Sequence, residues 1–451
     1  KFDLVIFDEA SQLPTGEAVG ALARGENVII VGDPKQLPPT SFFMTNHFDE
    51  ENSDKEDLES VLDDCLALMM PSRHLLWHYR SRHESLIAYS NSAFYENKLL
   101  TFPSPDDLIS NVSMVMCEGY YDRSSTKQNK NEAQAVVNEI IRRLRDEELR
   151  KQSIGVVTFS IVQQHLIDDM LTDALAADSE LEVLADSMYE PIFIKNLENV
   201  QGDERDVILF SVGYGPDKNG KVSMNFGPIN KDGGWRRLNV AITRSRKQMI
   251  VFSTIRPEQI DLSRTASEGV AGLKGFLEFA ARGKSALNLP APKSVSQNDK
   301  FIELIAKEIE VLGYKTKCNI GTSEYRIDIG VIDNDNPEKY LLGILLDGKG
   351  YRTAKTTRDR EIAQISVLNG LGWNILRVWS VDWWENPKKE TERLINAIDA
   401  IKSGSFEKDY DVESLFNEDD ITLKKLVTAK STKIPQYETA VLKEKIIYKN
   451  N

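Results

Sequence analysis

The sequence has few cysteines, few histidines and no long hydrophobic run, and each shortage excludes a class of protein. Cys65, Cys117 and Cys318 lie far apart without a CxxC pair, which argues against a disulfide framework and a thiolate zinc site. His74 and His78 are four residues apart but lack an HExxH frame, so a helical zinc site is not expected. No apolar run approaches a membrane span, and no basic-then-apolar leader opens the chain. These absences favour the reducing cytoplasm and no membrane partner.

Composition sets the scale of the molecule. The 451 residues, 41% of them hydrophobic, are enough for two to four domains with cores of their own. The formal net charge of −14 argues against wholesale coating of nucleic acid. It leaves room for a local basic groove, because binding depends on patches of charge rather than on their sum.

An apolar strand that ends in two acids opens the chain. Residues 4–7 are continuously apolar, the pattern of a strand covered on both faces in a parallel sheet. Asp8 and Glu9 follow at its carboxyl end, where such sheets bind ligands. Asp8 suits Mg²⁺ as an oxygen ligand, and Glu9 is then free to orient or deprotonate a water. Taken alone, this pair could also be two solvated acids.

A second strand is predicted at residues 27–31 and runs into the sequence GDPKQLPP at residues 32–39. The glycine and prolines favour a rigid loop, and Gln36 offers an uncharged amide that could sense a γ-phosphate or the attacking water. An ordinary proline-rich turn is the alternative. DEASQ followed by GDPKQLPP resembles motifs II and III of superfamily-one helicases of the up-frameshift-like branch. The resemblance implies that ATP is bound and hydrolysed with Mg²⁺.

The resemblance extends over roughly the first 255 residues and supplies two arginines. LWHYRSR at residues 76–82 resembles a segment whose arginine, here Arg80, reaches across the cleft to the γ-phosphate. RLNVAITRSR at residues 237–246 resembles the motif whose second γ-phosphate arginine is Arg244. Hydrolysis would then depend on closure of two lobes, since a guanidinium neutralises charge only at close range. Arg246 is equally well explained by an ion pair.

Two further motifs imply contact with nucleic acid. TFSxxQ, where the family often has TPYxxQ, gives Thr158 and Gln163 as candidates. QGDE resembles the QGxE motif, which implies that Gln201 lies near the bound strand and Glu204 near the ribose or the phosphate-coupling network. These candidates are polar rather than strongly basic, which suits backbone tracking without sequence readout.

A glycine-rich phosphate loop is missing from these residues. No GxxxxGK[ST] occurs, although backbone N–H groups of such a loop normally cradle the phosphates of ATP. We therefore expect the chain to be a fragment whose upstream part carries that loop.

Beyond a Pro/Ser-containing linker the pattern of the chain changes. An amphipathic helix at residues 301–312, strands at 325–332 and 340–347, a helix at 357–371 and a strand at 374–379 are predicted. The segments YRIDIGVID, YLLGILLDG, RDR and LGWNILRVW resemble the very-short-patch-repair-like branch of the PD-(D/E)XK nucleases. A small α/β restriction-endonuclease-like fold is therefore expected.

The spacing of its acids predicts a metal site. Positions i and i+2 of a strand share a face, so Asp347 and Lys349 can both point at the site that Asp328 enters from the next strand. Two carboxylates can hold one or two Mg²⁺, or Mn²⁺, ions that generate hydroxide, and the lysine could stabilise phosphorane charge. Glu303 on the first helix is a candidate further ligand. Solvated strand-end acids are the alternative for Asp328 and Asp347.

Two positions depart from this branch. Its GIExDG and YH motifs place a glutamate and a histidine where this chain has Leu345 and Arg352. A weakened nuclease, a DNA-binding remnant and a site that relies on Asp347 and Lys349 are all compatible with these residues.

The sequence thus predicts an α/β protein with RecA-like parallel-sheet motor lobes followed by a small restriction-endonuclease-like domain. The predicted segments are half of a first lobe (1–68), a second lobe (69–285), a linker (286–298), the nuclease-like domain (299–402) and a charged tail or tether into a downstream domain (403–451). Such an arrangement resembles large bacterial helicase–nuclease proteins that defend against foreign DNA. Single-stranded DNA in the motor and duplex or flap DNA at the nuclease are the expected partners. A motor with a DNA-binding remnant and an RNA-directed helicase are the alternatives.

Overall fold

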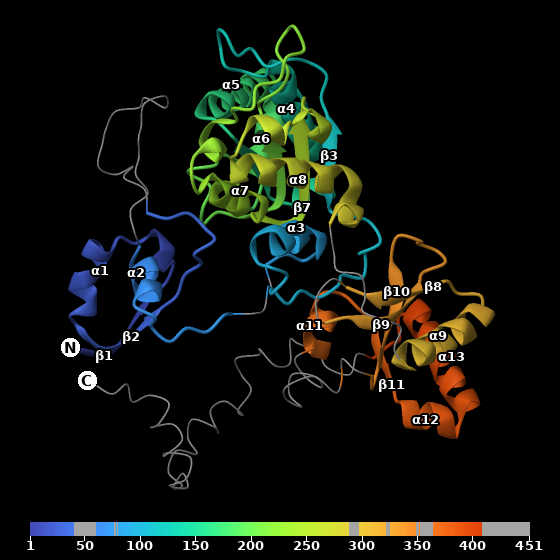
Figure 1. The fold of residues 1–451 in the computed structure, drawn as a ribbon. Coiled ribbons are helices and arrows are strands. Elements are labelled where there is room, and N and C mark those ends of the chain that lie inside the picture. The colour runs from blue at the N-terminus through green and yellow to red at the C-terminus, as the bar shows by residue number, and fades with distance from the viewer. Residues whose placement is uncertain are drawn as a thin grey trace.

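The fold is taken from a computed structural model. It describes residues 1–39, 60–75, 78, 80–287, 297–321, 325–348, 351 and 364–407. Figure 1 shows three bodies along the chain: a small N-terminal unit, a larger α/β lobe, and a third unit with its own sheet. In the described part of the chain, no helix has both the length and the apolar character needed to cross a membrane.

The N-terminal unit contains a two-stranded parallel sheet backed by short helices. Its elements are β1 (Phe2–Phe7), α1 (Thr15–Leu22), β2 (Gly25–Ile30) and α2 (Val61–Ala67). Ala10, Ala18, Val61 and Leu62 form its small core. Phe2, Leu4 and Ile6 are 63%, 44% and 60% exposed. The prediction that β1 is covered on both faces was wrong for the described residues, because the alternate side chains of Phe2, Leu4 and Ile6 face solvent.

The second lobe is a five-stranded parallel sheet in the order β3-β7-β6-β4-β5. The strands are β3 (Val112–Met116), β4 (Ile154–Thr158), β5 (Phe193–Asn196), β6 (Arg205–Ser211) and β7 (Ser245–Ser253). The helices are α3 (Ser85–Phe94), α4 (Lys130–Arg145), α5 (Ile161–Ala177), α6 (Ser179–Asp186), α7 (Gly234–Ile242) and α8 (Glu268–Arg282). The lobe confirms the predicted α/β class.

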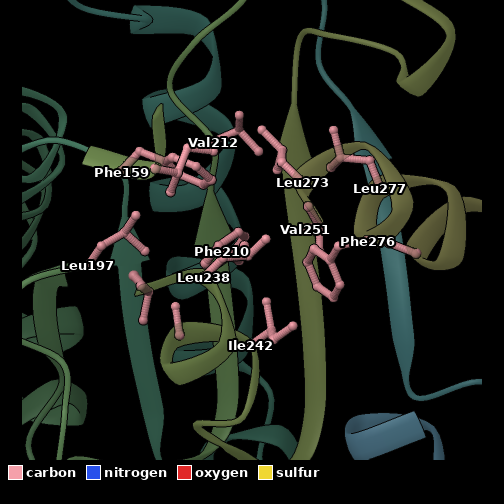
Figure 2. Close-up of a cluster of buried hydrophobic side chains, with 14 of the residues drawn as sticks. Phe159, Leu197, Phe210, Val212, Leu238, Ile242, Val251, Leu273, Phe276 and Leu277 are labelled. Atoms are coloured by element: carbon pink, nitrogen blue, oxygen red, sulfur yellow. The ribbon is translucent and has the colours of Figure 1, made fainter. Parts of the chain in front are cut away.

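Helices cover both faces of this sheet and bury two cores. One core joins the sheet to α3, α7 and α8, and Phe159, Phe210 and Phe276 meet in it (Figure 2). The other joins the sheet to α4, α5 and α6. Burial on both sides explains why β6 is apolar over most of its length, as expected for a central parallel strand.

The third unit is a mixed four-stranded sheet in the order β11-β10-β9-β8. Strands β8 (Thr316–Ile320), β9 (Ile327–Ile332) and β10 (Tyr340–Leu346) pair antiparallel, and β11 (Ile375–Val378) pairs parallel to β10. Its helices are α9 (Gln297–Val311), α11 (Gln364–Gly370), α12 (Ser380–Glu385) and α13 (Pro387–Ser403). The sequence predictions missed β8, α12 and α13.

The third unit is docked on the second lobe through residues 102–105, which we call the docking strap. The Trp373 indole N–H donates to the Pro103 carbonyl at 2.7 Å, and the Tyr340 backbone N–H donates to that of Pro105 at 2.7 Å. Phe102 stacks on Tyr325 with ring centroids 4.8 Å apart and is 6% exposed. The two units are therefore joined by side-chain and backbone contacts as well as by the chain between them.

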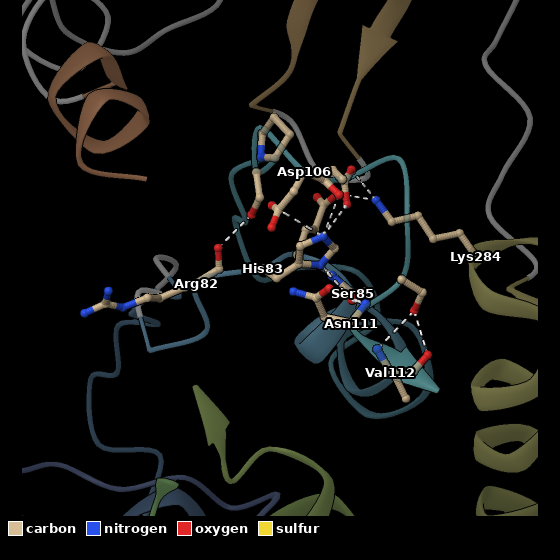
Figure 3. A network of polar contacts seen from close by, with 12 residues as sticks. Arg82, His83, Ser85, Asp106, Asn111, Val112 and Lys284 are labelled. Atoms are coloured by element: carbon tan, nitrogen blue, oxygen red, sulfur yellow. Dashed lines mark hydrogen bonds and ion pairs between the residues drawn. The ribbon is translucent and has the colours of Figure 1, made fainter. Parts of the chain in front are cut away.

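A network of polar and charged side chains holds residues 106 and 107, directly after the strap, to the second lobe (Figure 3). Lys284 Nζ lies 2.9 Å from a Glu84 carboxylate oxygen and 2.5 Å from one of Asp107. His83 is buried, with Nδ1 2.7 Å from the Ser85 hydroxyl and Nε2 3.3 Å from the Asp106 carbonyl. Burial works against the charge on Lys284, but Glu84 and Asp107 raise its pKa overall. The residues that follow the strap are therefore held by the second lobe, while the strap itself contacts the third unit.

Candidate functional site

The first pair of acids lies at the end of β1. Asp8 and Glu9 are both exposed, and the Glu9 N–H donates to an Asp8 carboxylate oxygen at 2.9 Å. Glu9 has φ 50° and ψ 37°, in the left-handed region. A residue with a side chain pays about 1–2 kcal/mol for this conformation, which recurs at functional sites. The strand end therefore presents two carboxylates on a tightly turned backbone.

Gly32 lets the ends of β1 and β2 approach each other. A Cβ atom there would lie 2.9 Å from the Ser11 nitrogen and 3.2 Å from the Ala10 nitrogen. The Ala10 N–H donates to the Val31 carbonyl at 2.9 Å, which fixes this approach. The glycine therefore brings the loop at residues 33–39 beside the two acids.

Gln36 lies in that loop and is held by its own neighbour. Its amide nitrogen donates to an Asp33 carboxylate oxygen at 3.0 Å. The next residue, Leu37, is 4% exposed and packs into a core of the second lobe. The loop thus belongs to the N-terminal unit by sequence but is seated on the second lobe.

Two arginines of the second lobe are the candidates to complete this site. Arg80 Nε lies 2.8 Å from a Glu204 carboxylate oxygen. Arg244 is 2% exposed, and its guanidinium donates to the Val240 carbonyl at 2.8 Å. Burial and the nearby Arg80 charge lower the pKa of Arg244 to about 10, while Glu9 and Glu204 act in the opposite direction. The charge of Glu9 in the N-terminal unit therefore acts on Arg244 of the second lobe.

Arg246 has a different environment. Its guanidinium contacts Glu190, lies 3.2 Å from Asp206 and 3.6 Å from Glu204. Three carboxylates on one surface arginine support the ion-pair interpretation of this residue.

His78 also belongs to this site, although sequence reasoning considered it only as a metal ligand. Its Nε2 lies 2.9 Å from the Ser81 hydroxyl oxygen. Burial, followed by the charges of Arg80 and Arg244, lowers the pKa of His78 to about 4. The imidazole is therefore neutral at pH 7 and adds no further positive charge beside the arginines.

The candidate strand-contacting residues are less accessible than the motifs imply. Thr158 and Gln163 are 0% and 1% exposed. The Gln163 amide is bonded to the Asn129 backbone at 3.0 and 3.1 Å, and the Thr158 hydroxyl donates to the Ser160 carbonyl at 2.9 Å. Both side chains face inward here because they tie loops of the lobe together, so their contact with a strand stays a prediction.

Gln201 is partly buried with both amide atoms inaccessible. Within the described residues, neither atom has a hydrogen-bond partner. An unpaired buried amide is costly, so the site is one that a ligand or water would satisfy.

In the third unit, Asp328 and Asp347 lie close enough to interact but are already hydrogen-bonded. One Asp328 oxygen accepts from the Leu346 N–H at 2.7 Å. The two Asp347 oxygens accept from the Ser380 N–H at 2.9 Å and from its hydroxyl at 2.7 Å. Asp347 therefore binds the first residue of α12, so both of its oxygens already have a protein partner.

The position between these acids is apolar. Leu345 pairs with Arg377 of β11 and is 3% exposed, within a hydrophobic core. The Arg377 guanidinium stacks over the rings of Tyr351 and Trp379, 4.9 and 5.6 Å from their centroids. Leucine thus occupies the position where the predicted resemblance to the very-short-patch-repair-like nucleases implied a glutamate.

The described residues fit a divalent ion poorly. Glu303 is exposed on α9, and no group of three or more His, Cys, Asp or Glu side chains converges in the described part of the chain. Lys349 and Arg352 lie outside the described residues. The metal ligands proposed from the sequence therefore stay predictions.

Comparison with known families divides the chain in the same way. Residues 1–43 and 58–256 match two family models that are each described as an AAA domain. Residues 301–398 match a model named REase_MTES_1575. The chain carries AAA domains followed by a REase domain.

Relatives of known name are helicases. The chain is 30% identical over 421 residues to an uncharacterized ATP-dependent helicase, the MG140 homolog of Mycoplasma pneumoniae; the match covers 88% of this chain and 37% of the relative. It is 25% identical over 264 residues to the mouse 5′-3′ DNA helicase ZGRF1, covering 56% and 13%. It is 23% identical over 292 residues to the Schizosaccharomyces pombe helicase/nuclease dna2, covering 56% and 19%. The chain thus spans well under half of each relative.

The REase domain offers a prediction about pH. Burial and the Asp347 charge raise the pKa of Asp328 from 3.8 to about 6, against the Leu346 N–H and Arg377. The folded state therefore binds more protons than the unfolded state between about pH 4 and 6, and its stability falls as the pH rises through this range. We expect Asp328→Asn to stabilise the protein at pH 8, by at most about 3 kcal/mol, and to have little effect near pH 4. Melting temperatures at both pH values measure this, and an equal gain at the two would contradict it.

Proposed function

We propose that this chain is part of an ATP-dependent DNA helicase or translocase that moves on single-stranded DNA and carries a DNA-binding REase domain. The observation that carries the proposal is the seating of the Gln36 loop on the lobe that holds Arg80, Arg244 and Glu204, with the Glu9 charge acting on Arg244. A hydrolytic site of this kind works only when the lobes are close, which links turnover to lobe movement.

The roles of the residues follow from their positions. Mg²⁺ held by Asp8 would neutralise phosphate charge when bound. Glu9 is exposed at the strand end, where its carboxylate can orient a water and take its proton. Arg80 is paired with Glu204 at 2.8 Å, so its reach to a γ-phosphate requires exchange of that partner. Gln36 presents its amide from a loop that is fixed to the second lobe.

We propose that the phosphate-binding loop comes from outside these 451 residues. No GxxxxGK[ST] occurs in them, and the exposed apolar side chains of β1 form a face that further sheet and helices would cover. The coverage of the relatives, at 37% or less for the three named above, agrees with a longer functional protein.

We propose DNA as the substrate and 5′ to 3′ as the direction of movement. Relatives include proteins named as a 5′-3′ DNA helicase, a DNA polymerase alpha-associated DNA helicase and DNA replication helicase/nucleases. RNA-directed activity is the alternative. We also propose a role in defence against foreign DNA, and the order of the domains is its sole support.

For the REase domain we propose DNA binding without cleavage. Both oxygens of Asp347 are bonded to Ser380, and Leu345 replaces a carboxylate in the apolar core. A Mg²⁺- or Mn²⁺-dependent endonuclease of the very-short-patch-repair-like type is the second candidate, favoured by the proximity of Asp328 and Asp347.

The decisive experiment measures ATP turnover by the full-length protein with single-stranded DNA, RNA or neither. We expect stimulation by DNA above RNA, and loss of at least a hundredfold in turnover for Glu9→Gln, since the water loses its oriented base. Unchanged turnover in Glu9→Gln would refute the proposed site.

Plasmid nicking in Mg²⁺ and in Mn²⁺ decides between the two roles of the REase domain. Cleavage by the wild type that is lost in both Asp328→Ala and Asp347→Ala would establish the endonuclease. DNA binding without cleavage would support the binding role.

A further inference from the structure

The loop that carries Gln36 is bonded to the second lobe by two side chains, Tyr95 and Asn239, to which the helicase-like motifs assign no role. Three hydrogen bonds, from Tyr95 and Asn239, reach this loop or close the cluster around it. We call Asp33, Lys35, Tyr95 and Asn239 the interlobe latch. Through Asp33 and Lys35 it joins the loop of Gln36 to the lobe that contains both arginines.

Tyr95 lies at the end of α3 and holds the same carboxylate as Gln36. Its hydroxyl donates to the Asp33 Oδ2 atom at 2.6 Å, and the Gln36 amide donates to that same atom at 3.0 Å. Burial and the Asp33 charge raise the pKa of Tyr95 far above its usual range, so the hydroxyl stays a donor. Any displacement of Tyr95 therefore changes the partner that orients Gln36.

Asn239 closes the latch from α7. Its amide nitrogen donates to the Lys35 carbonyl at 2.9 Å and to the Tyr95 hydroxyl at 3.0 Å, and its oxygen accepts from the Ser90 hydroxyl at 2.8 Å. The side chain is 1% exposed, so every polar atom of the amide is used inside the protein. A buried amide with this set of partners fixes one arrangement of the three elements.

The helices that carry Tyr95 and Asn239 are also close in the chain to Arg80 and Arg244. The Asn239 carbonyl accepts from the Thr243 hydroxyl at 3.0 Å, and that hydroxyl accepts from the Arg244 guanidinium at 3.1 Å. Helix α3 begins five residues after Arg80. A shift of the second lobe therefore moves the arginines and the support of Gln36 together.

We propose that Tyr95 and Asn239 are positioning residues that couple Gln36 to the second lobe during ATP hydrolysis. This inference rests on the proposed ATPase function. The latch orients Gln36 without touching the nucleotide, so its loss lowers the rate of the hydrolytic step and leaves ATP binding unchanged.

Tyr95→Phe tests this in the full-length protein, because it removes one hydroxyl and keeps the ring. We expect the DNA-stimulated kcat to fall about tenfold, with KM for ATP and the affinity for single-stranded DNA each within twofold of the wild type. Tyr89→Phe is the matched control: Tyr89 lies on the same helix, is buried, and donates its hydroxyl to the Gly272 carbonyl at 2.6 Å within the second lobe. It should leave kcat unchanged.

A double-mutant cycle with Gln36→Ala separates positioning from a structural role. If Tyr95 acts through Gln36, Tyr95→Phe has no further effect on kcat in the Gln36→Ala background. Full additivity of the two changes, or equal loss of kcat in Tyr89→Phe, would overturn the latch. So would a wild-type kcat in Tyr95→Phe while Glu9→Gln is inactive, and that result leaves the proposed ATPase intact. Activity in Glu9→Gln would instead refute the ATPase site itself.

Discussion

Arg244→Ala is expected to reduce ATP turnover about a thousandfold, within the range found for arginines that stabilise phosphoryl transfer. The side chain is buried and feels the charges of Arg80 and Glu9, and low solvent exposure strengthens its effect on charge that develops at a phosphate. Arg244→Lys should recover little, because an ammonium lacks the planar fork of donors. Steady-state hydrolysis with saturating DNA measures the loss.

Arg282→Ala provides the control for that experiment. This arginine lies on α8 of the same lobe and pairs with Glu258 at 2.7 Å on the surface. Its loss should change turnover less than twofold, since an exposed pair contributes little. Turnover within tenfold of the wild type in Arg244→Ala would remove this residue from the site.

Phe102→Ala is expected to loosen the REase domain from the second lobe. The ring is buried and stacked on Tyr325, and truncation of a buried phenylalanine costs about 3–5 kcal/mol. Because the strap also accepts the Tyr340 N–H, hydrogen exchange at this amide reports local opening. We expect that exchange to accelerate more than a hundredfold, with protection in β6 unchanged.

Ile109→Ala is the matched change for the strap, since Ile109 follows it in the chain and is 48% exposed. It should leave exchange at Tyr340 as in the wild type. Equal protection of Tyr340 in Phe102→Ala would mean that the strap contributes nothing to docking.

Short motifs predicted much of the motor because each marks a strand end or a helix. Asp8, Gln36, Arg80 and Arg244 came from such motifs, and in the structure all four lie outside the helices and strands. Their shared role in ATP hydrolysis stays a prediction. The period of the apolar residues likewise predicted β9, β10 and β11 within a few residues. A local sequence pattern is enough to predict an element when residues nearby in the sequence determine its structure.

Exposure and long-range pairing could not be read in the same way. The apolar run of β1 indicates two covered faces, yet burial depends on which elements pack on the strand. Tyr95 lies in none of the helicase-like motifs, and its partner Asp33 is 62 residues away in the sequence. Asn239 lies within the RLNVAITRSR segment, but the motif implies a role only for its arginine, Arg244. Phe102 carried no signal, because its partner belongs to another domain.

The exposed side chains of β1 also govern how this chain behaves by itself. Phe2, Leu4 and Ile6 leave a flat apolar strand surface in water, next to Ile29 of β2 at 46% exposed. Surfaces of this kind associate with one another through the hydrophobic effect and through strand pairing. The N-terminal unit therefore limits the solubility of the isolated 451 residues. We expect the monomer to self-associate as its concentration rises.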